Sequence, residues 1–280
     1  MSQDLYRNRD FIPDFDELLA ETAARSRELS RGVEVRADVP YGNGPRERMD
    51  LILPERAAKG APVHIFIHGG YWRSGRKEDH HLMAAPVLAA GGIAAIVGYD
   101  LMPGTRLGVI VAQVRAAARK LAALAPSLGG DAARMSASGH SAGAHLASYL
   151  AAIGPEDTEV WDMPAFQGLL LISGIYELSE IPGSFLKDEA KMTPAEAAAW
   201  SPLTSRQLAG PRRIVMVAEH DTRPFHIQGE QFAASLERDC GRAAYRVEPG
   251  LNHLSVVLAL SDPSTPQGEC LMQLIEGVGG

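Results

Sequence analysis

Apolar residues in the middle of the chain fall into short runs, and longer helix-like stretches separate these runs. The runs lack the strict alternation of a strand with one face in water, which is typical of strands buried on both faces. Residues 107–124 (LGVIVAQVRAAARKLAAL) form the clearest of the intervening helices. Strands that alternate with helices predict a parallel sheet with helices on both faces. The predicted strands occupy residues 63–67, 93–99, 134–139, 168–173 and 213–218.

The flanking regions extend this sheet. Residues 33–39 and 48–53 alternate as half-exposed strands do, and the turn-rich YGNGP between them predicts an antiparallel hairpin. A last strand is expected at 243–248, and a helix with an acidic first turn at 14–30. The predicted fold is α/β: about eight strands, mostly parallel, with an antiparallel edge hairpin and helices on both faces.

The chain shows no linker, repeat or low-complexity segment, so we expect one domain over residues 1–280. An N-terminal helical segment of about residues 1–31 precedes the first strand. Residues 154–167 and 175–211 are rich in proline, tryptophan and acidic side chains. They are predicted to be cap-like insertions over the ends of the strands.

Charge and composition limit the partners. Lysine and arginine (27 together) are scattered and outnumbered by 34 acidic residues, which argues against nucleic acid or an anionic membrane as the main partner. No apolar run approaches the roughly 20 residues that cross a bilayer. The polar, acidic N-terminus is unlike a secretory signal. We therefore expect a cytoplasmic protein in which Cys240 and Cys270 are free thiols.

The string Gly-His-Ser-Ala-Gly at 139–143 lies where a predicted strand gives way to an alanine-rich helix. Gly-x-Ser-x-Gly at such a junction is typical of a nucleophile elbow, a tight turn that points the serine hydroxyl into the cleft. Ser141 could instead only cap the helix. The strand before it and the helix after it favour the elbow.

A serine nucleophile needs a base, and the base needs a third group to orient it. In hydrolases with this elbow the acid and then the histidine follow the serine along the chain. Asp221 follows the strand at 213–218 and is preferred to Glu219 as the acid, because it opens a turn-forming DTRP segment. His253 follows the last strand and is the expected base, with His220 as its nearest rival.

The other histidines have simpler interpretations. His80 and His81 are expected to be solvent-exposed, and His226 to lie on a helix face. His140 and His145 are five residues apart, so they do not share a helix face as an i, i+4 metal-binding pair would. We expect neither a metal nor a cofactor.

The sequence His-Gly-Gly-Tyr-Trp at 68–72 ends the first buried strand. Two glycines there allow backbone N–H groups to converge on a carbonyl oxygen, and a further donor comes from the residue after the nucleophile. The expected oxyanion donors are Gly70, Tyr71 and Ala142. The alternative is a plain tight turn at the two glycines. His68 is expected to brace this loop.

Further motifs extend the pattern over about residues 6–257. They are YRNRDFIPD, YDLMP, SGIYEL, WSP, EHDTRPF and GLNHLSVV. The ensemble resembles the α/β-hydrolases, in particular the branch that holds kynurenine formamidase (arylformamidase) and related esterases. The resemblance implies Ser141, Asp221 and His253 as a catalytic triad, and oxyanion donors at Gly70, Tyr71 and Ala142. Ala144 departs from the pattern, where a second glycine is expected, but it lies beyond the elbow.

The resemblance implies a serine hydrolase that cleaves an aryl formamide, such as N-formylkynurenine, to an aryl amine and formate through an acyl-enzyme. The alternative is a carboxylesterase for short-chain acyl esters. A ligand-binding receptor without catalysis is disfavoured, because all three triad residues are present. Tyr71, Trp72 and Trp161 could line the aryl site. The N-terminal segment could cover the mouth of the site or mediate a homodimer, and both interpretations stay open.

Overall fold

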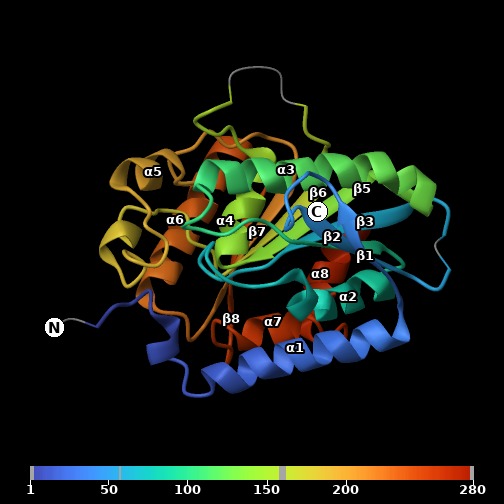
Figure 1. Ribbon diagram of the computed structural model, residues 1–280, viewed down its shortest axis with the longest axis horizontal. Helices are drawn as coiled ribbons and strands as arrows, with labels where there is room; N and C mark the ends of the chain where they lie inside the picture. The colour runs from blue at the N-terminus through green and yellow to red at the C-terminus, as the bar shows by residue number, and fades with distance from the viewer. Residues whose placement is uncertain (1–2, 57, 158–161, 278–280) are drawn as a thin grey trace.

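The computed structural model describes residues 3–56, 58–157 and 162–277. Its centre is one eight-stranded sheet in the order β1-β2-β4-β3-β5-β6-β7-β8 (Figure 1). β1 pairs antiparallel with β2 and β2 antiparallel with β4, whereas the other neighbours are parallel. The predicted α/β sheet with an antiparallel edge is therefore confirmed. The strands are β1 (Glu34–Pro40), β2 (Arg48–Leu53), β3 (Ala61–Ile67), β4 (Ile93–Val97), β5 (Gly130–His140), β6 (Phe166–Ile172), β7 (Arg212–Ala218) and β8 (Ala243–Glu248).

Every predicted strand is present, with differences only at the ends. β5 begins at Gly130, four residues before the predicted start, in a stretch of small and polar residues that hydrophobicity does not mark as a strand. β4 ends at Val97, two residues before its predicted end. Phe166 and Gln167, predicted to belong to an insertion, are the first residues of β6.

Helices cover the two faces of the sheet (Figure 1). One core cluster joins the odd-numbered residues of β3, such as Val63 and Ile65, to α3 (Leu107–Leu124), α4 (Ala142–Ser148) and α6 (Arg223–Cys240). The other cluster joins strand residues on the opposite face, such as Phe66 of β3 and Ile96 of β4, to four helices. These are α1 (Phe15–Gly32), α2 (Ala84–Ala89), α7 (Ser255–Leu260) and α8 (Pro266–Glu276). Successive side chains of a strand point to opposite faces, so the continuous apolar runs supply both cores.

Short helical turns complete the chain. They are η1 (Asn8–Asp10), η2 (Lys77–Met83), η3 (Ala125–Leu128), η4 (Tyr149–Ala151), η5 (Ile181–Gly183) and α5 (Pro194–Ala199). The last two belong to the predicted insertion at 175–211. Both cysteines are free, as expected. Within the described ranges no helix is long and apolar enough to cross a membrane.

The parallel strands end level with one another. Ile67 at the end of β3 pairs with Gly139 of β5, and His140 pairs with Ile172 at the end of β6. Ala218 and Glu248, the last residues of β7 and β8, are also paired. The loops that follow these strands therefore lie together at the carboxyl ends of the parallel strands, where open α/β sheets bind their ligands.

Candidate active site

Ser141 occupies a strained turn between β5 and α4. Its backbone angles are φ 55° and ψ −120°, a region that a non-glycine residue adopts only when its surroundings impose it. The Ser141 N–H donates to the Ile172 carbonyl (2.8 Å), and the Ser141 carbonyl accepts from Ala144 N–H (2.9 Å). The side chain forms no capping hydrogen bond. The turn thus leaves the hydroxyl unused by the helix that follows.

Two glycines make this turn sterically possible. A Cβ on Gly139 would overlap the Gly143 carbonyl, and a Cβ on Gly143 would overlap the Ile67 carbonyl at the end of β3. Any larger residue would push α4 away from the sheet. Glycine is therefore required at both positions by close backbone approach.

The loop after β3 packs directly against Ser141. A Cβ on Gly69 would lie 3.1 Å from the Ser141 Cβ. Gly70 has φ 111°, and Tyr71 and Trp72 also have positive φ, at 51° and 58°. Within the part of the chain that the structure describes, neither the Gly70 nor the Tyr71 N–H donates a hydrogen bond. Ala142 begins α4, so its N–H has no acceptor within the helix. The backbone donors expected of an oxyanion hole are thus uncommitted.

His68 braces this loop, as expected. Its Nδ1–H donates to the Gly69 carbonyl (2.7 Å), and its ring stacks on Tyr99 with centroids 4.3 Å apart. The Tyr99 hydroxyl donates to the His68 carbonyl (2.7 Å). Burial lowers the pKa of His68 to about 3, so the ring is neutral near pH 7.

His253 and Asp221 meet beside the elbow. His253 Nδ1 lies 2.6 Å from Asp221 Oδ1, so Nδ1 carries the proton in this bond and Nε2 is left as the basic nitrogen. Asp221 Oδ2 accepts from the Ser173 hydroxyl (2.6 Å) and from the Ala218 N–H (3.0 Å). Three donors therefore fix the orientation of this buried carboxylate.

The His253 loop is joined to the elbow itself. His140, the residue before Ser141, donates from Nε2 to the His253 carbonyl (2.7 Å). Their rings lie 4.7 Å apart, and the Phe225 ring packs against His253 at the same distance. Burial, then the neighbouring His253, holds the pKa of His140 well below its usual value. His140 thus acts on the loop as a neutral donor.

The two rivals considered for acid and base have other positions. Glu219 Oε2 accepts from the Gly250 N–H (2.7 Å), and this bond ties the acid loop to the histidine loop. His220 is exposed, and its N–H donates to the Leu251 carbonyl (2.9 Å). Neither side chain contacts His253 or Asp221 among the described hydrogen bonds.

Trp72 and His145 form a buried support under the loop. The Trp72 indole N–H donates to His145 Nδ1 (3.2 Å), and His145 Nε2 donates to the Trp200 carbonyl (2.8 Å). Burial lowers the pKa of His145 to about 4. The Trp72 side chain has no exposed surface, so in this structure it holds the loop from inside rather than presenting a free face to a ligand.

The remaining aryl-site candidates differ in position. Tyr71 is 9% exposed, and its ring lies edge-on to Phe185 at 5.3 Å. Burial raises the pKa of the Tyr71 phenol well above its usual value, which keeps the hydroxyl a neutral donor. Trp161 lies outside the described residues.

Sequence reasoning missed Ser173 and His145 as supporting residues. Ser173 has φ 47° and directly follows β6, so only the juxtaposition of β6 and β7 brings it to Asp221. His145 was considered only as half of a metal-binding pair. A signal existed for Ser173: like Ser141, it is a polar residue at the carboxyl end of a buried strand.

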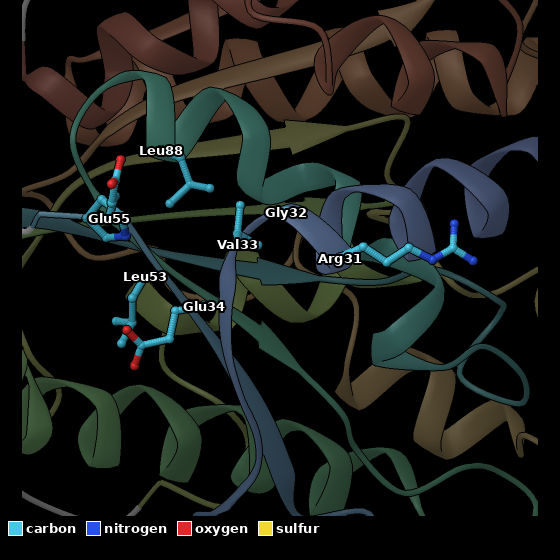
Figure 2. Close-up of a pocket in the computed structure, with 8 residues that line it drawn as sticks. Arg31, Gly32, Val33, Glu34, Leu53, Glu55 and Leu88 are labelled. Atoms are coloured by element: carbon cyan, nitrogen blue, oxygen red, sulfur yellow. The ribbon is translucent and has the colours of Figure 1, made fainter.

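Two other features do not form a catalytic centre. His64 lies between Ser136 and Ser138, 2.8 and 2.7 Å from its ring nitrogens, but all three are buried inside the sheet and join β3 to β5. The groove in Figure 2 has a volume of about 560 Å³ and lies between the end of α1, the start of β1, the end of β2 and α2. Because β2 runs antiparallel to β4, the end of β2 lies beside the start of β4. The groove is therefore at the amino-terminal end of the parallel strands, opposite Ser141. Among the described residues no group of His, Cys, Asp and Glu is arranged to hold a metal ion.

Known proteins resemble this chain in sequence and in fold. The family model described as BD-FAE matches residues 49–171. Kynurenine formamidase of Danio rerio is 30% identical over 245 residues, 85% of this chain and 81% of the relative. Kynurenine formamidase of Salmo salar is 29% identical over 272 residues, 95% and 90% of the two chains.

Among solved structures, the hyperthermophilic esterase of the archaeon Pyrobaculum calidifontis superposes with a TM-score of 0.73. It is 23% identical, and the match covers 98% of this chain and 92% of that one. This likeness concerns the fold, whereas the sequence similarity to the fish proteins covers most of the chain. The chain belongs to the kynurenine formamidase family of α/β-hydrolases.

Proposed function

We propose that this protein is a serine hydrolase that cleaves an aryl formamide such as N-formylkynurenine, with Ser141 as nucleophile, His253 as base and Asp221 as the acid that orients it. The observation that carries the proposal is the bond of 2.6 Å between His253 and Asp221 beside the strained elbow at Ser141. The family membership supports the formamide as the substrate class.

The acylation step follows from these roles. His253 Nε2 takes the Ser141 proton as the hydroxyl oxygen attacks the formyl carbon, and Asp221 stabilises the imidazolium that forms. Negative charge develops on the former carbonyl oxygen, where the N–H groups of Gly70, Tyr71 and Ala142 are proposed to receive it. His253 then gives the proton to the departing aryl nitrogen as the C–N bond breaks.

A formyl ester on Ser141 remains after the aryl amine leaves. His253 removes a proton from water as the water attacks this ester, and the second tetrahedral intermediate collapses when the proton returns to the Ser141 oxygen. The products are formate and free enzyme. The aryl amine is the first product because it departs when the formyl group is transferred to Ser141. Electron withdrawal by the ring makes its nitrogen a better leaving group than that of an alkyl amine.

The alternative is a carboxylesterase for short-chain acyl esters, because the same groups would serve an ester with an alcohol as leaving group. Turnover of N-formylkynurenine and of p-nitrophenyl acetate separates the two. We expect kcat/KM to favour the formamide and both activities to vanish in Ser141→Ala. Serine-dependent turnover of the ester alone would support the carboxylesterase instead.

Compartment and assembly are separate proposals. We expect a cytoplasmic enzyme, because Cys240 and Cys270 are free thiols, as is usual in a reducing compartment. A homodimer is one expected assembly, and sedimentation velocity at several concentrations tests it. Cell fractionation with an antibody against the chain tests the compartment.

A further inference from the structure

The first residues that the structure describes lie at the active-site end of the sheet, where they contact the loops that follow the strands. Residues 4–7, here called the strap, precede η1 and lie on the side of the molecule where α5 and α6 are drawn in Figure 1. Each of three successive strap residues contacts a different loop. The Phe185 N–H donates to Asp4 Oδ2 (2.5 Å), the Thr222 hydroxyl donates to the Leu5 carbonyl (2.6 Å), and the Tyr71 hydroxyl donates to the Tyr6 carbonyl.

Tyr6 anchors the strap. Its side chain is only 4% exposed, although it lies close to the start of the chain. Its hydroxyl donates to Glu180 Oε2 (2.9 Å) and accepts from Gln228 Nε2 (3.0 Å). Its ring lies 6.2 Å from Phe225, which packs against His253. The strap is therefore attached to the protein by a buried, hydrogen-bonded side chain as well as by its backbone contacts.

The strap contacts Tyr71 in a stretch of backbone with unfavourable dihedral angles. Tyr71 and Trp72 are consecutive non-glycine residues with positive φ, and each such conformation costs about 1–3 kcal/mol unless the surroundings impose it. Trp72 is fixed from inside, by His145 and by the Met102 N–H that donates to its carbonyl (2.8 Å). The Tyr71 hydroxyl has the strap as its hydrogen-bond acceptor among the described residues.

We infer that the strap is a positioning element of the active site, in which Tyr6 holds Tyr71 so that the Tyr71 N–H stays directed at the oxyanion. This inference rests on the proposed function and adds to it a segment outside the strand-end loops. An oxyanion donor acts mainly on the transition state, so loss of the strap contact should lower kcat and change KM little.

The test compares full-length Tyr6→Ala with Arg9→Ala. The first removes the buried anchor, whereas Arg9 lies beyond the strap, is exposed and pairs with Asp16 (2.5 Å). On p-nitrophenyl acetate and N-formylkynurenine we expect Tyr6→Ala to lose about 10- to 100-fold in kcat with KM within about 3-fold. Arg9→Ala should match the wild type. The pH profile of kcat/KM should keep its shape, because the base and the acid are untouched.

Two further variants keep the inference falsifiable. Tyr6→Phe retains the ring and the carbonyl that accepts from Tyr71, so it should recover most of the kcat lost in Tyr6→Ala. If Tyr6→Ala does not fold by near-UV circular dichroism, Asp4→Ala releases the other end of the strap from Phe185 and should show a smaller fall in kcat.

The outcomes separate this inference from the proposed function. A wild-type protein that turns over neither substrate contradicts the proposed function, and the strap inference with it. An active wild type with unchanged kcat in Tyr6→Ala overturns the strap inference alone. A rise in KM without a fall in kcat also overturns it, because that result would make the strap a part of the substrate-binding wall only.

Discussion

Ser173 forms a hydrogen bond to the carboxylate oxygen of Asp221 that does not contact His253. The hydroxyl donates to Asp221 Oδ2 at 2.6 Å while His253 occupies Oδ1. A carboxylate held at both oxygens cannot rotate away from the imidazole, and rotation would weaken its support of the imidazolium. Ser173 therefore acts on the chemistry through Asp221, without contact to substrate.

Ser173→Ala should lower kcat about 10- to 100-fold and leave KM nearly unchanged, because a hydrogen bond to a charged group contributes about 1.5–3 kcal/mol. Steady-state hydrolysis of p-nitrophenyl acetate measures this effect. Ser179→Ala is the matched control, since Ser179 is exposed and its hydrogen bonds within the described residues go to Glu177 alone. Wild-type kcat in Ser173→Ala would show that His253 and the Ala218 N–H suffice to orient the acid.

Some residue assignments follow from sequence and others do not. Ser141, Asp221 and His253 could be singled out because each follows a buried strand, and strand ends are visible in the hydrophobic pattern. His81 was expected to be solvent-exposed, and this was wrong: it is 6% exposed and its Nε2 lies 2.8 Å from Asp50. Its partners, Asp50 and Ser30, are 31 and 51 residues away in the chain. Contacts at that separation leave no local pattern.

At the scale of elements, the close approach of α4 to β3 fixes the elbow. Gly143 lies where its missing side chain admits the Ile67 carbonyl, and Gly139 admits the Gly143 carbonyl. The nucleophile turn and the loop after β3 are thus positioned by the same backbone contact. Ser141 and the proposed oxyanion donors should respond together to any change there.

Gly143→Ala should destabilise the fold by more than about 3 kcal/mol or prevent folding, because the added Cβ would overlap a backbone carbonyl that cannot move out of the sheet. Urea denaturation monitored by circular dichroism measures the change. Gly32→Ala is the control, because nothing lies within 4 Å of a Cβ at that position. Equal stability of the two variants would contradict the contact that the structure places at Gly143.

Element boundaries show where sequence prediction stops. The apolar cores of β3, β6 and β7 were predicted closely, since burial on both faces requires a continuous apolar run. The first residues of β5 are small or polar (Gly-Asp-Ala-Ala), yet the strand begins there because Ala61 of β3 lies opposite Gly130. The partner strand, rather than the local sequence, determines where such a strand begins.

At the scale of the whole molecule, several histidines are buried in the neutral state. Burial lowers the pKa of His64 and His68 to about 3 and that of His145 to about 4. In the unfolded chain each would titrate near 6.5. Between these values the unfolded state binds more protons than the folded state, so stability is lost as the pH falls from about 6.5 toward 4.

The free energy of unfolding should fall by up to about 2 kcal/mol for each of these histidines between pH 7 and pH 5, because each proton contributes about 1.4 kcal/mol per pH unit below the unfolded pKa. Denaturation at a series of pH values measures the slope. His64→Gln should reduce the slope by the contribution of about one proton, whereas Ser179→Ala, which removes no titrating group, should leave it unchanged. A slope that His64→Gln does not alter would mean that His64 takes up a proton in the folded protein.

The strap also bears on how the protein should be produced and immobilised. Any polypeptide fused ahead of Asp4 would end three residues before Tyr6, whose carbonyl accepts from the Tyr71 hydroxyl. Helix α8 reaches Glu276 at the far side of the sheet, where the Ile275 carbonyl accepts from Gln167 at the start of β6 (2.9 Å). We therefore expect a purification tag or surface tether attached after α8 to leave turnover unchanged, whereas the same tag placed ahead of the strap should lower kcat.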